Sequence, residues 1–204
     1  MAFSVRIFLP CPMRAVFQAA PLCVAMCAQA ADDITIHAEK QGSAVAIEAH
    51  ALVVAPLPLI WETLTDYDRL STFIPGMHIS RVIERRAQVA IVKQQGEAGF
   101  LFFTRPIEVV VESLEKPPYV IEIRVLSGNL KRLDGRYQIE PDANVPGHFV
   151  LRWSGVIEPE TRLPPLIGVA ILRSNVRDQF RGMVREIERR AELLRNPQKS
   201  KNNE

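Results

Sequence analysis

The residue types that most often perform catalysis are scattered along this chain of 204 residues. None of the four histidines (His37, His50, His78 and His148) stands four residues from another, the spacing with which a helix presents two ligands to one metal ion. The sequence contains neither a glycine-rich phosphate loop that opens a helix nor a Gly-x-Ser-x-Gly nucleophile motif. We therefore predict no metal site, no bound cofactor and no covalent nucleophile.

Asp66 and Asp68 form a pair of neighbouring carboxylates, and carboxylates can perform acid–base chemistry. A short helical turn is predicted over 67–71, directly after the first of them. Aspartate side chains at the start of a helix accept hydrogen bonds from free backbone N–H groups. We therefore favour helix capping over catalysis for this pair.

Four arginines fall within predicted strands: Arg105, Arg124, Arg132 and Arg152. An inward-facing guanidinium would be costly to bury unless it were paired or bound to an anionic ligand. Strand alternation places Arg124 and Arg152 opposite the most apolar rows. We therefore expect these arginines on the outer face of the sheet.

The first thirty residues have the order of features found in a secretory signal peptide. Arg14 precedes a mostly apolar stretch over 15–27, and Ala28-Gln29-Ala30 supplies the small residues of a signal-peptidase site. The alternative, an uncleaved membrane anchor, fits less well because the stretch is under about 20 residues. We expect cleavage before Ala31 and a periplasmic or secreted mature protein. Translation from Met13 is an alternative start.

Charge and length narrow the class of protein further. Two of the 25 basic residues and none of the 23 acidic residues lie in 1–30, so the rest of the chain has equal numbers of both. Such a chain lacks the excess of Lys and Arg that neutralises nucleic-acid phosphates, which argues against nucleic-acid binding. All three cysteines lie within the first 27 residues, so the mature protein is expected to fold without disulfides. We predict one domain over 31–196 and a polar tail over 197–204.

The middle of the chain has the periodicity of antiparallel strands. Candidate strands run over 34–55, 79–85, 87–95, 100–115, 119–126, 130–140 and 149–157. Gly42-Ser43 interrupts the first stretch, which allows two short strands there. No helix-length segment separates the strands, so we predict hairpins rather than strand–helix–strand units.

Helical patterns flank this run of strands. Residues 56–65 begin with two prolines in the first turn, where backbone N–H groups have no helical partner, and then show an apolar stripe. Near the C-terminus, apolar residues recur at spacings of three and four, which predicts one long helix over 166–194.

A distinctive motif lies between the first helix and the strands. The sequence reads Trp61-x-x-Leu64-Thr65-Asp66-Tyr67, followed by Phe73-Ile74-Pro75. This motif resembles the start of a START-like (SRPBCC) domain of the polyketide cyclase/dehydrase or coenzyme Q-binding branch, and the resemblance extends over about 43–195. It implies an α+β helix-grip fold, in which a curved seven-stranded antiparallel sheet wraps around a long C-terminal helix and encloses an apolar cavity.

In such a fold, the apolar faces of the strands and of the last helix would line the cavity. The residues that we expect to line it are Trp61, Phe73, Tyr119, Ile121, Ile123, Leu151, Trp153, Val176, Phe180 and Met183. Moving apolar ligand surface from water into a cavity is favourable by about 25 cal/mol per Å². We therefore favour non-catalytic binding or transport of a hydrophobic small molecule, such as a lipid or an isoprenoid quinone.

The same resemblance leaves an enzymatic alternative open, a polyketide cyclase or dehydratase acting in this cavity. That chemistry requires a general acid or base inside the cavity. The candidate groups are Tyr137, His148 and Asp134. An inward-facing His148 or Asp134 with a perturbed pKa would favour the enzyme, whereas a wholly apolar lining would favour the binder.

A row of arginines lies opposite the apolar face of the last helix. Its members, Arg173, Arg177, Arg181 and Arg185, recur every four residues. Such a row is typical of a solvent-exposed helix face, and nearby glutamates dilute its charge. The alternative is contact with an anionic partner or a membrane surface through lipid headgroups.

Overall fold

The computed structural model describes residues 34–100, 103–160 and 165–196. The elements are β1 (Thr35–Gln41), β2 (Ala44–Val53), α1 (Leu57–Thr65), the 3-10 turn η2 (Tyr67–Arg69), α2 (Leu70–Phe73), β3 (Met77–Arg86), β4 (Val89–Phe100), β5 (Phe103–Lys116), β6 (Val120–Gly128), β7 (Leu130–Pro141), β8 (Phe149–Pro159) and α3 (Pro165–Arg195). The signal peptide expected over 1–30 and the tail expected over 197–204 lie outside the described residues.

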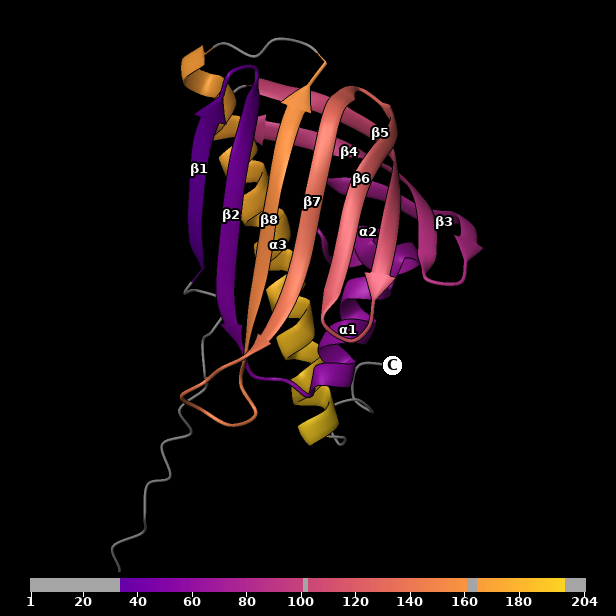
Figure 1. Ribbon diagram of the computed structural model, residues 1–204, viewed down its shortest axis with the longest axis vertical. Helices are drawn as coiled ribbons and strands as arrows, with labels where there is room; N and C mark the ends of the chain where they lie inside the picture. Colours follow the sequence, from indigo (N-terminus) through magenta and orange to yellow (C-terminus); the bar gives the residue numbers. More distant parts are fainter. Residues whose placement is uncertain (1–33, 101–102, 161–164, 197–204) are drawn as a thin grey trace, which may run out of the picture.

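The described strands form one antiparallel sheet in the order β1-β2-β8-β7-β6-β5-β4-β3 (Figure 1). The sequence predicts seven strands, and the described residues form eight. The additional strand is β1, which pairs with β2 across a two-residue turn at Gly42-Ser43. Gly42 has a φ of 64°, a value that tight hairpin turns require and that glycine adopts without steric cost. The expected α+β fold is otherwise confirmed.

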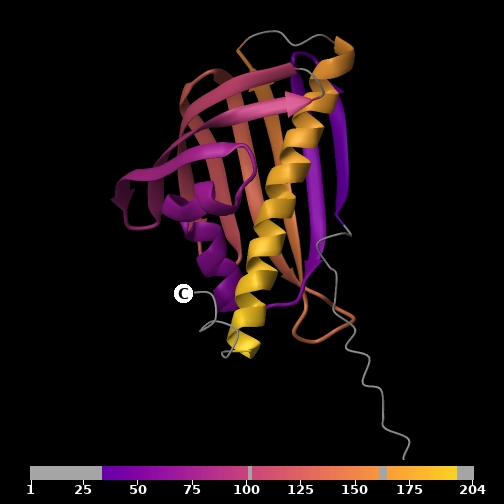
Figure 2. The same ribbon diagram turned by 180° about the vertical axis from the view of Figure 1, so that it is seen from behind.

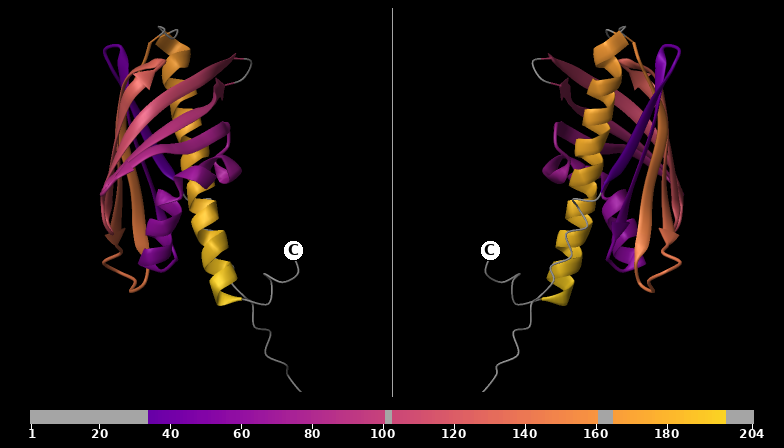
Figure 3. Two further views of the ribbon diagram at one scale, coloured as in Figure 1. Left: turned by 90° about the vertical axis from the view of Figure 1, so that its right-hand side faces the viewer. Right: turned by 90° about the vertical axis from the view of Figure 1, so that its left-hand side faces the viewer.

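The sheet is strongly curved, and α3 lies along its concave side (Figures 2 and 3). Strands β1, β2 and β4 contact the helix; β4 runs across its axis, whereas β1 and β2 run along it (Figure 2). The apolar stripe of α3 points into the sheet and is buried, with Phe180, Val184 and Ile187 between 0% and 2% exposed. The predicted helix and its inward face are thus observed, and the face opposite the core includes the exposed Arg173.

Asp66 and Asp68, which were predicted to cap a helix, instead connect the helical segment before β3 to other parts of the fold. Neither aspartate caps a helix, because no side-chain cap hydrogen bond is present at α1, η2 or α2. Asp68 Oδ1 instead accepts a hydrogen bond from the backbone N–H of Val82, at 2.8 Å, and so ties η2 to β3. Asp66 binds Arg190 of α3. The capping interpretation is therefore wrong for both residues, since each carboxylate joins two distant elements.

Three of the four strand arginines lie on the outer face of the sheet, as expected. Arg124 pairs with Glu112 across β6 and β5, at 2.8 Å, and Arg152 pairs with Glu140 across β8 and β7, at 2.9 Å. Arg132 pairs with Asp134 on its own strand. Surface pairs of this kind contribute little to stability. Arg105 is exposed, but it alternates in register with Ile107 and Val109 of the cavity wall, so the outer-face prediction is wrong for this residue.

Within the described residues, no helix is long and apolar enough to cross a membrane.

Candidate ligand-binding cavity

A cavity lies between the concave face of the sheet, α3 and the helical segment over 57–76. Its volume is about 170 Å³, far above the roughly 10–15 Å³ that one water molecule requires. Strands β4 to β8 contribute one wall, and α3 contributes the other. Leu64, Leu70 and Ile74 from the helical segment close one side.

Most of the cavity wall is aliphatic or aromatic. The apolar side chains from the sheet include Ile107, Val109, Val111, Ile121, Ile123, Leu133 and Ile157, and those from α3 are Leu172, Val176, Phe180 and Met183. Among the described residues that line the cavity, Glu97 is the only charged one, and it is exposed to solvent. The interior therefore offers a ligand mainly apolar contact.

Two glycines make room for the largest side chain of the wall. Gly135 of β7 and Gly155 of β8 are paired in register, and the Trp153 indole lies against both. A Cβ atom at Gly155 would approach the indole to 2.8 Å, and one at Gly135 would approach it to 3.5 Å. Because position 155 has no side chain, the indole can lie close to the sheet instead of projecting across the cavity.

Two tyrosines bring hydroxyl groups to the otherwise apolar wall. Tyr67 enters from η2 and Tyr137 from β7. Burial raises the pKa of Tyr137, and burial together with the Glu115 carboxylate raises that of Tyr67. Both hydroxyls therefore stay protonated near neutral pH, where they can donate hydrogen bonds but cannot act as bases.

Amide side chains line the cavity where α3 meets β4. Gln179 Nε2 donates to Asn175 Oδ1 at 3.0 Å, and Asn175 Nδ2 donates to the backbone oxygen of Glu97 at 3.4 Å. Gln94 points to the same interior from β4. This side of the cavity is consequently more polar than the centre.

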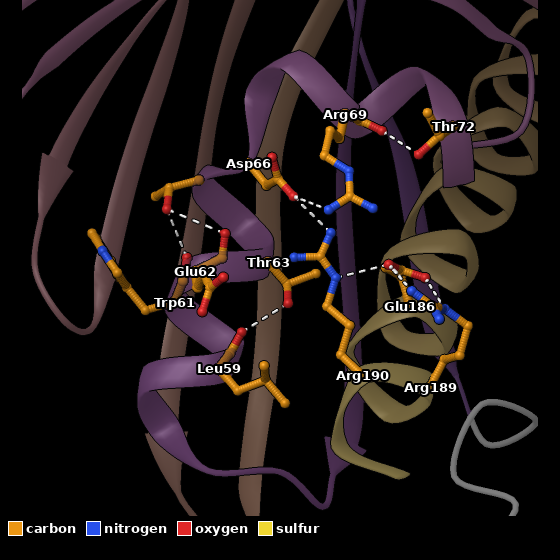
Figure 4. Close-up of polar contacts among 11 residues, drawn as sticks. Leu59, Trp61, Glu62, Thr63, Asp66, Arg69, Thr72, Glu186, Arg189 and Arg190 are labelled. Carbon is orange, nitrogen blue, oxygen red and sulfur yellow. Dashed lines mark hydrogen bonds and ion pairs between the residues drawn. The ribbon is translucent and has the colours of Figure 1, made fainter. Parts of the chain in front are cut away.

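An ion-pair cluster fastens α1 and η2 to the C-terminal half of α3 (Figure 4). This cluster, called the Arg190 cluster below, consists of Asp66, Arg69, Glu186, Arg189 and Arg190. Arg190 contacts Asp66 Oδ2 and Glu186 Oε1, both at 2.7 Å, and its side chain is only 10% exposed. Burial raises the pKa of Glu186, but hydrogen bonds from Arg189 and Arg190 outweigh burial and lower it. The cluster thereby fixes the helical side of the cavity against α3.

Six of the ten residues expected on the cavity wall are found there. They are Ile121, Ile123, Trp153, Val176, Phe180 and Met183. Strand alternation and helical periodicity place these side chains on the inward faces of β6, β8 and α3. Leu151 is also fully buried, but it belongs to the packed core next to the cavity and does not line it.

Three expected wall residues lie elsewhere. Tyr119 precedes β6 in the turn after Lys116, outside the strand ladder, and is 44% exposed. Phe73 packs beneath the Arg190 guanidinium, 5.6 Å from its ring centroid, and lines a surface groove instead. Trp61 is half-buried on α1, because Ile60 and Leu64 occupy the inward face of that helix.

The three groups considered for acid–base catalysis are separated in the structure. Tyr137 lines the cavity, whereas Asp134 points outward and pairs with Arg132. His148 lies near the start of β8 and does not line the cavity. Within the described residues, no group of three or more His, Cys, Asp or Glu side chains is placed to hold a metal ion.

The sequence reasoning missed several polar wall residues, notably Tyr67, Ser113 and Gln94. Strand alternation could have predicted an inward Ser113, since it follows Val109 and Val111 at two-residue spacing on the inward face of β5. Gln94 alternates in the same way with Ala90 and Val92 on β4. Both were passed over because polar residues are ordinarily assigned to the outer face of a sheet.

Comparison with known proteins identifies the family. The family model described as polyketide cyclase/dehydrase and lipid transport matches residues 53–184, well over half of the chain. The chain belongs to this family. The matched region begins at the end of β2 and ends within α3, so it contains every residue of the cavity wall. No curated protein matches the chain in sequence.

Solved structures share the fold of this polyketide cyclase/dehydrase and lipid transport family member. The ZhuI aromatase/cyclase from Streptomyces sp. R1128 matches with a TM-score of 0.61 and 16% identity, over 72% of this chain and 95% of that one. A STAR-related lipid transfer protein from Xanthomonas axonopodis gives 0.60 and 12%, over 76% and 93%. A START superfamily protein from Mycobacterium smegmatis gives 0.56 and 14%, over 73% and 98%. At these identities the likeness shows the START-like fold alone.

Proposed function

We propose that this protein binds a hydrophobic small molecule in the cavity and carries it without chemical change. The observation that carries the proposal is the cavity wall of mainly aliphatic and aromatic side chains, on which the only charged residue among those described is the solvent-exposed Glu97. Ligands with many polar groups would lose their hydration there and find few partners. The family description, which includes lipid transport, supports the same class of ligand.

Affinity sets a lower limit on the size of this ligand. Micromolar binding requires about 8 kcal/mol, and apolar burial supplies about 25 cal/mol per Å². Roughly 320 Å² of apolar ligand surface must therefore be buried before association costs are met. A lipid or an isoprenoid offers that area, whereas a small fragment does not.

Binding can be tested with the two tryptophans, because only Trp153 lies on the cavity wall. Trp61→Phe leaves Trp153 as the sole tryptophan, and Trp153→Phe leaves only Trp61, which lies outside the cavity. Titration with fatty acids, quinones and sterols should change the fluorescence of the Trp61→Phe protein and leave that of Trp153→Phe almost unchanged. The proposal fails if all three ligand classes leave Trp153 emission unchanged while a hydrophilic metabolite alters it.

The cyclase or dehydratase alternative has less support. Of its three candidate groups, only Tyr137 reaches the cavity, and burial raises its pKa, so near neutral pH it could donate a proton but has no base beside it from the other two candidates. Neither His148 nor Asp134, the groups whose inward position would have favoured an enzyme, lines the wall. Non-catalytic binding requires no such group and is therefore preferred.

We further propose that the mature protein acts outside the cytoplasm and meets membranes through α3. The proposed export is supported by the order of features over 1–30. Membrane contact would use the arginine row, in which Arg173 is exposed, although Arg181 is paired with Asp178 at 3.5 Å. Co-sedimentation with anionic vesicles, compared with neutral vesicles, tests this contact. Equal binding to both would contradict it.

A further inference from the structure

Tyr67 carries a buried hydroxyl group that the protein leaves unsatisfied. The residue is 5% exposed and lines the cavity, and its hydroxyl makes no hydrogen bond of good geometry to any described residue, although Ser113 and Glu115 lie close enough to influence it. Buried polar groups without a partner are rare and costly in folded proteins, so each requires an explanation. A ligand that accepts a hydrogen bond from this hydroxyl inside the cavity would supply one.

The surroundings of this hydroxyl restrict the kind of ligand group that fits. Ser113 and Glu115 of β5 lie beside it, and both are buried, at 2% and 8% exposure. Glu115 is held by Arg85, at 3.1 Å, and the Arg85 guanidinium also lies 5.7 Å from the centroid of the Tyr67 ring. The carboxylate is therefore a fixed negative charge next to the hydroxyl.

The register of the sheet places the second tyrosine near this position. Glu115 is paired with Ile121, Ile121 with Tyr137, and Tyr137 with Trp153, so the four form one inward row. Neighbouring strands are about 4.8 Å apart, so Tyr137 stands about 10 Å from Glu115 along this row. The Tyr67 and Ser113 hydroxyls thus lie beside Glu115 at one end of this row, which we call the hydroxyl end, and Tyr137 and Trp153 continue the row across the cavity wall.

We propose that the hydroxyl end binds an uncharged carbonyl oxygen, as in a ketone, quinone or ester, at one end of an otherwise apolar ligand, with Tyr67 as the hydrogen-bond donor. This inference rests on the proposed function and adds the polar group of the ligand. The raised pKa of Tyr67 keeps the proton on the donor. An ionised carboxylate is excluded from the same place, because it would approach the negative charge of Glu115 in a desolvated site.

The test compares three probes that share a twelve-carbon chain and differ at one end: methyl laurate, laurate and dodecane. Each displaces the uncharged dye N-phenyl-1-naphthylamine from the purified full-length protein at pH 8. Tyr67→Phe removes the donor, and Tyr119→Phe is the matched control, since Tyr119 is 44% exposed and lies outside the cavity.

We expect Tyr67→Phe to weaken methyl laurate binding by about 3- to 10-fold, the effect of one lost hydrogen bond to an uncharged group. Dye and dodecane binding should not change, and Tyr119→Phe should match the wild type for every probe. The wild-type protein should bind methyl laurate at least about tenfold more tightly than laurate, because the carboxylate must be desolvated beside Glu115.

Equal methyl laurate affinities in Tyr67→Phe and wild type, or tighter binding of laurate than of its ester, would overturn the inference while leaving the proposed function in place. Failure of the dye and of every probe to bind the wild type would contradict both. Thermal unfolding without ligand supplies an independent check. Removing an unpaired buried hydroxyl should leave Tyr67→Phe at least as stable as the wild type, and a lower midpoint would show that the hydroxyl is already bonded within the protein.

Discussion

Replacing Arg190 by alanine tests whether the Arg190 cluster holds the helical side of the cavity in place. The substitution removes the 2.7 Å contacts to Asp66 and Glu186 and the cation that lies over the Phe73 ring. Glu186, 7% exposed, would keep Arg189 as its partner, and Asp66 would keep only Arg69 at 3.7 Å. Removing one member of a buried ion pair typically costs about 3–5 kcal/mol. Because Glu186 retains one partner, we expect the lower end of this range, about 3 kcal/mol.

Arg189 provides the matched control for this substitution. It is the same residue type, adjacent in sequence, and bound to the same carboxylate, but its side chain is 53% exposed instead of 10%. Exposed ion pairs contribute about 0.2–1 kcal/mol, so Arg189→Ala should cost no more than about 1 kcal/mol.

Urea unfolding of both variants and of the wild type measures the two losses in the free energy of unfolding. Thermal unfolding gives a second readout: in a domain of this size, a loss of about 3 kcal/mol lowers the Tm by roughly 6–12 °C, and a loss of about 1 kcal/mol lowers it by roughly 2–4 °C. Equal losses for Arg190→Ala and Arg189→Ala would refute the reasoning, because burial would then have no bearing on the value of these contacts.

Three further predictions concern the core, the response to acid and the N-terminus. Phe180→Asp should cost several kcal/mol, since a charge would be left unpaired at a position that is 2% exposed; an unchanged melting temperature would show that this face of α3 is not buried. The pKa of Glu186 is lower in the folded than in the unfolded protein. Its ionised carboxylate therefore contributes fully to folding stability above the unfolded pKa of about 4.3, and this contribution is lost as the pH falls through the folded pKa. Glu186→Gln should accordingly reduce the loss of stability between pH 6 and pH 3, and an identical loss in both proteins would contradict the assignment. N-terminal sequencing of the exported protein should begin at or near Ala31, and a retained Met1 or Met13 would contradict cleavage.

Periodicity alone was sufficient for the inward faces of the long elements. A strand repeats every two residues and α3 repeats every 3.6, so one buried residue fixes the orientation of the rest. Ile121, Ile123 and Trp153 were placed on the wall in this way, as were Phe180 and Met183. Periodicity fails to predict side-chain orientation at the ends of strands and helices. Tyr119 continues the alternation of β6 in sequence, but it belongs to the preceding turn and its side chain faces solvent.

Contacts between distant elements could not be read from local patterns. Asp66 is followed by a helical turn, so local reasoning assigns it to capping, whereas its partner Arg190 is 124 residues away. Tyr67 lies in a three-residue turn with no periodicity, and only the packing of η2 against the sheet brings it to the cavity. Residues on long strands and on α3 were therefore predictable from the sequence, whereas groups brought to the site by contacts between distant elements, such as Tyr67, were not.

Native mass spectrometry of the protein purified from its own host tests the central claim most directly. The account predicts a complex of the mature chain with one apolar molecule, which is released by organic solvent and has the same mass after prolonged incubation with the protein. A co-purifying hydrophilic metabolite, or conversion of the bound apolar molecule into a product of different mass, would contradict non-catalytic binding of a hydrophobic ligand.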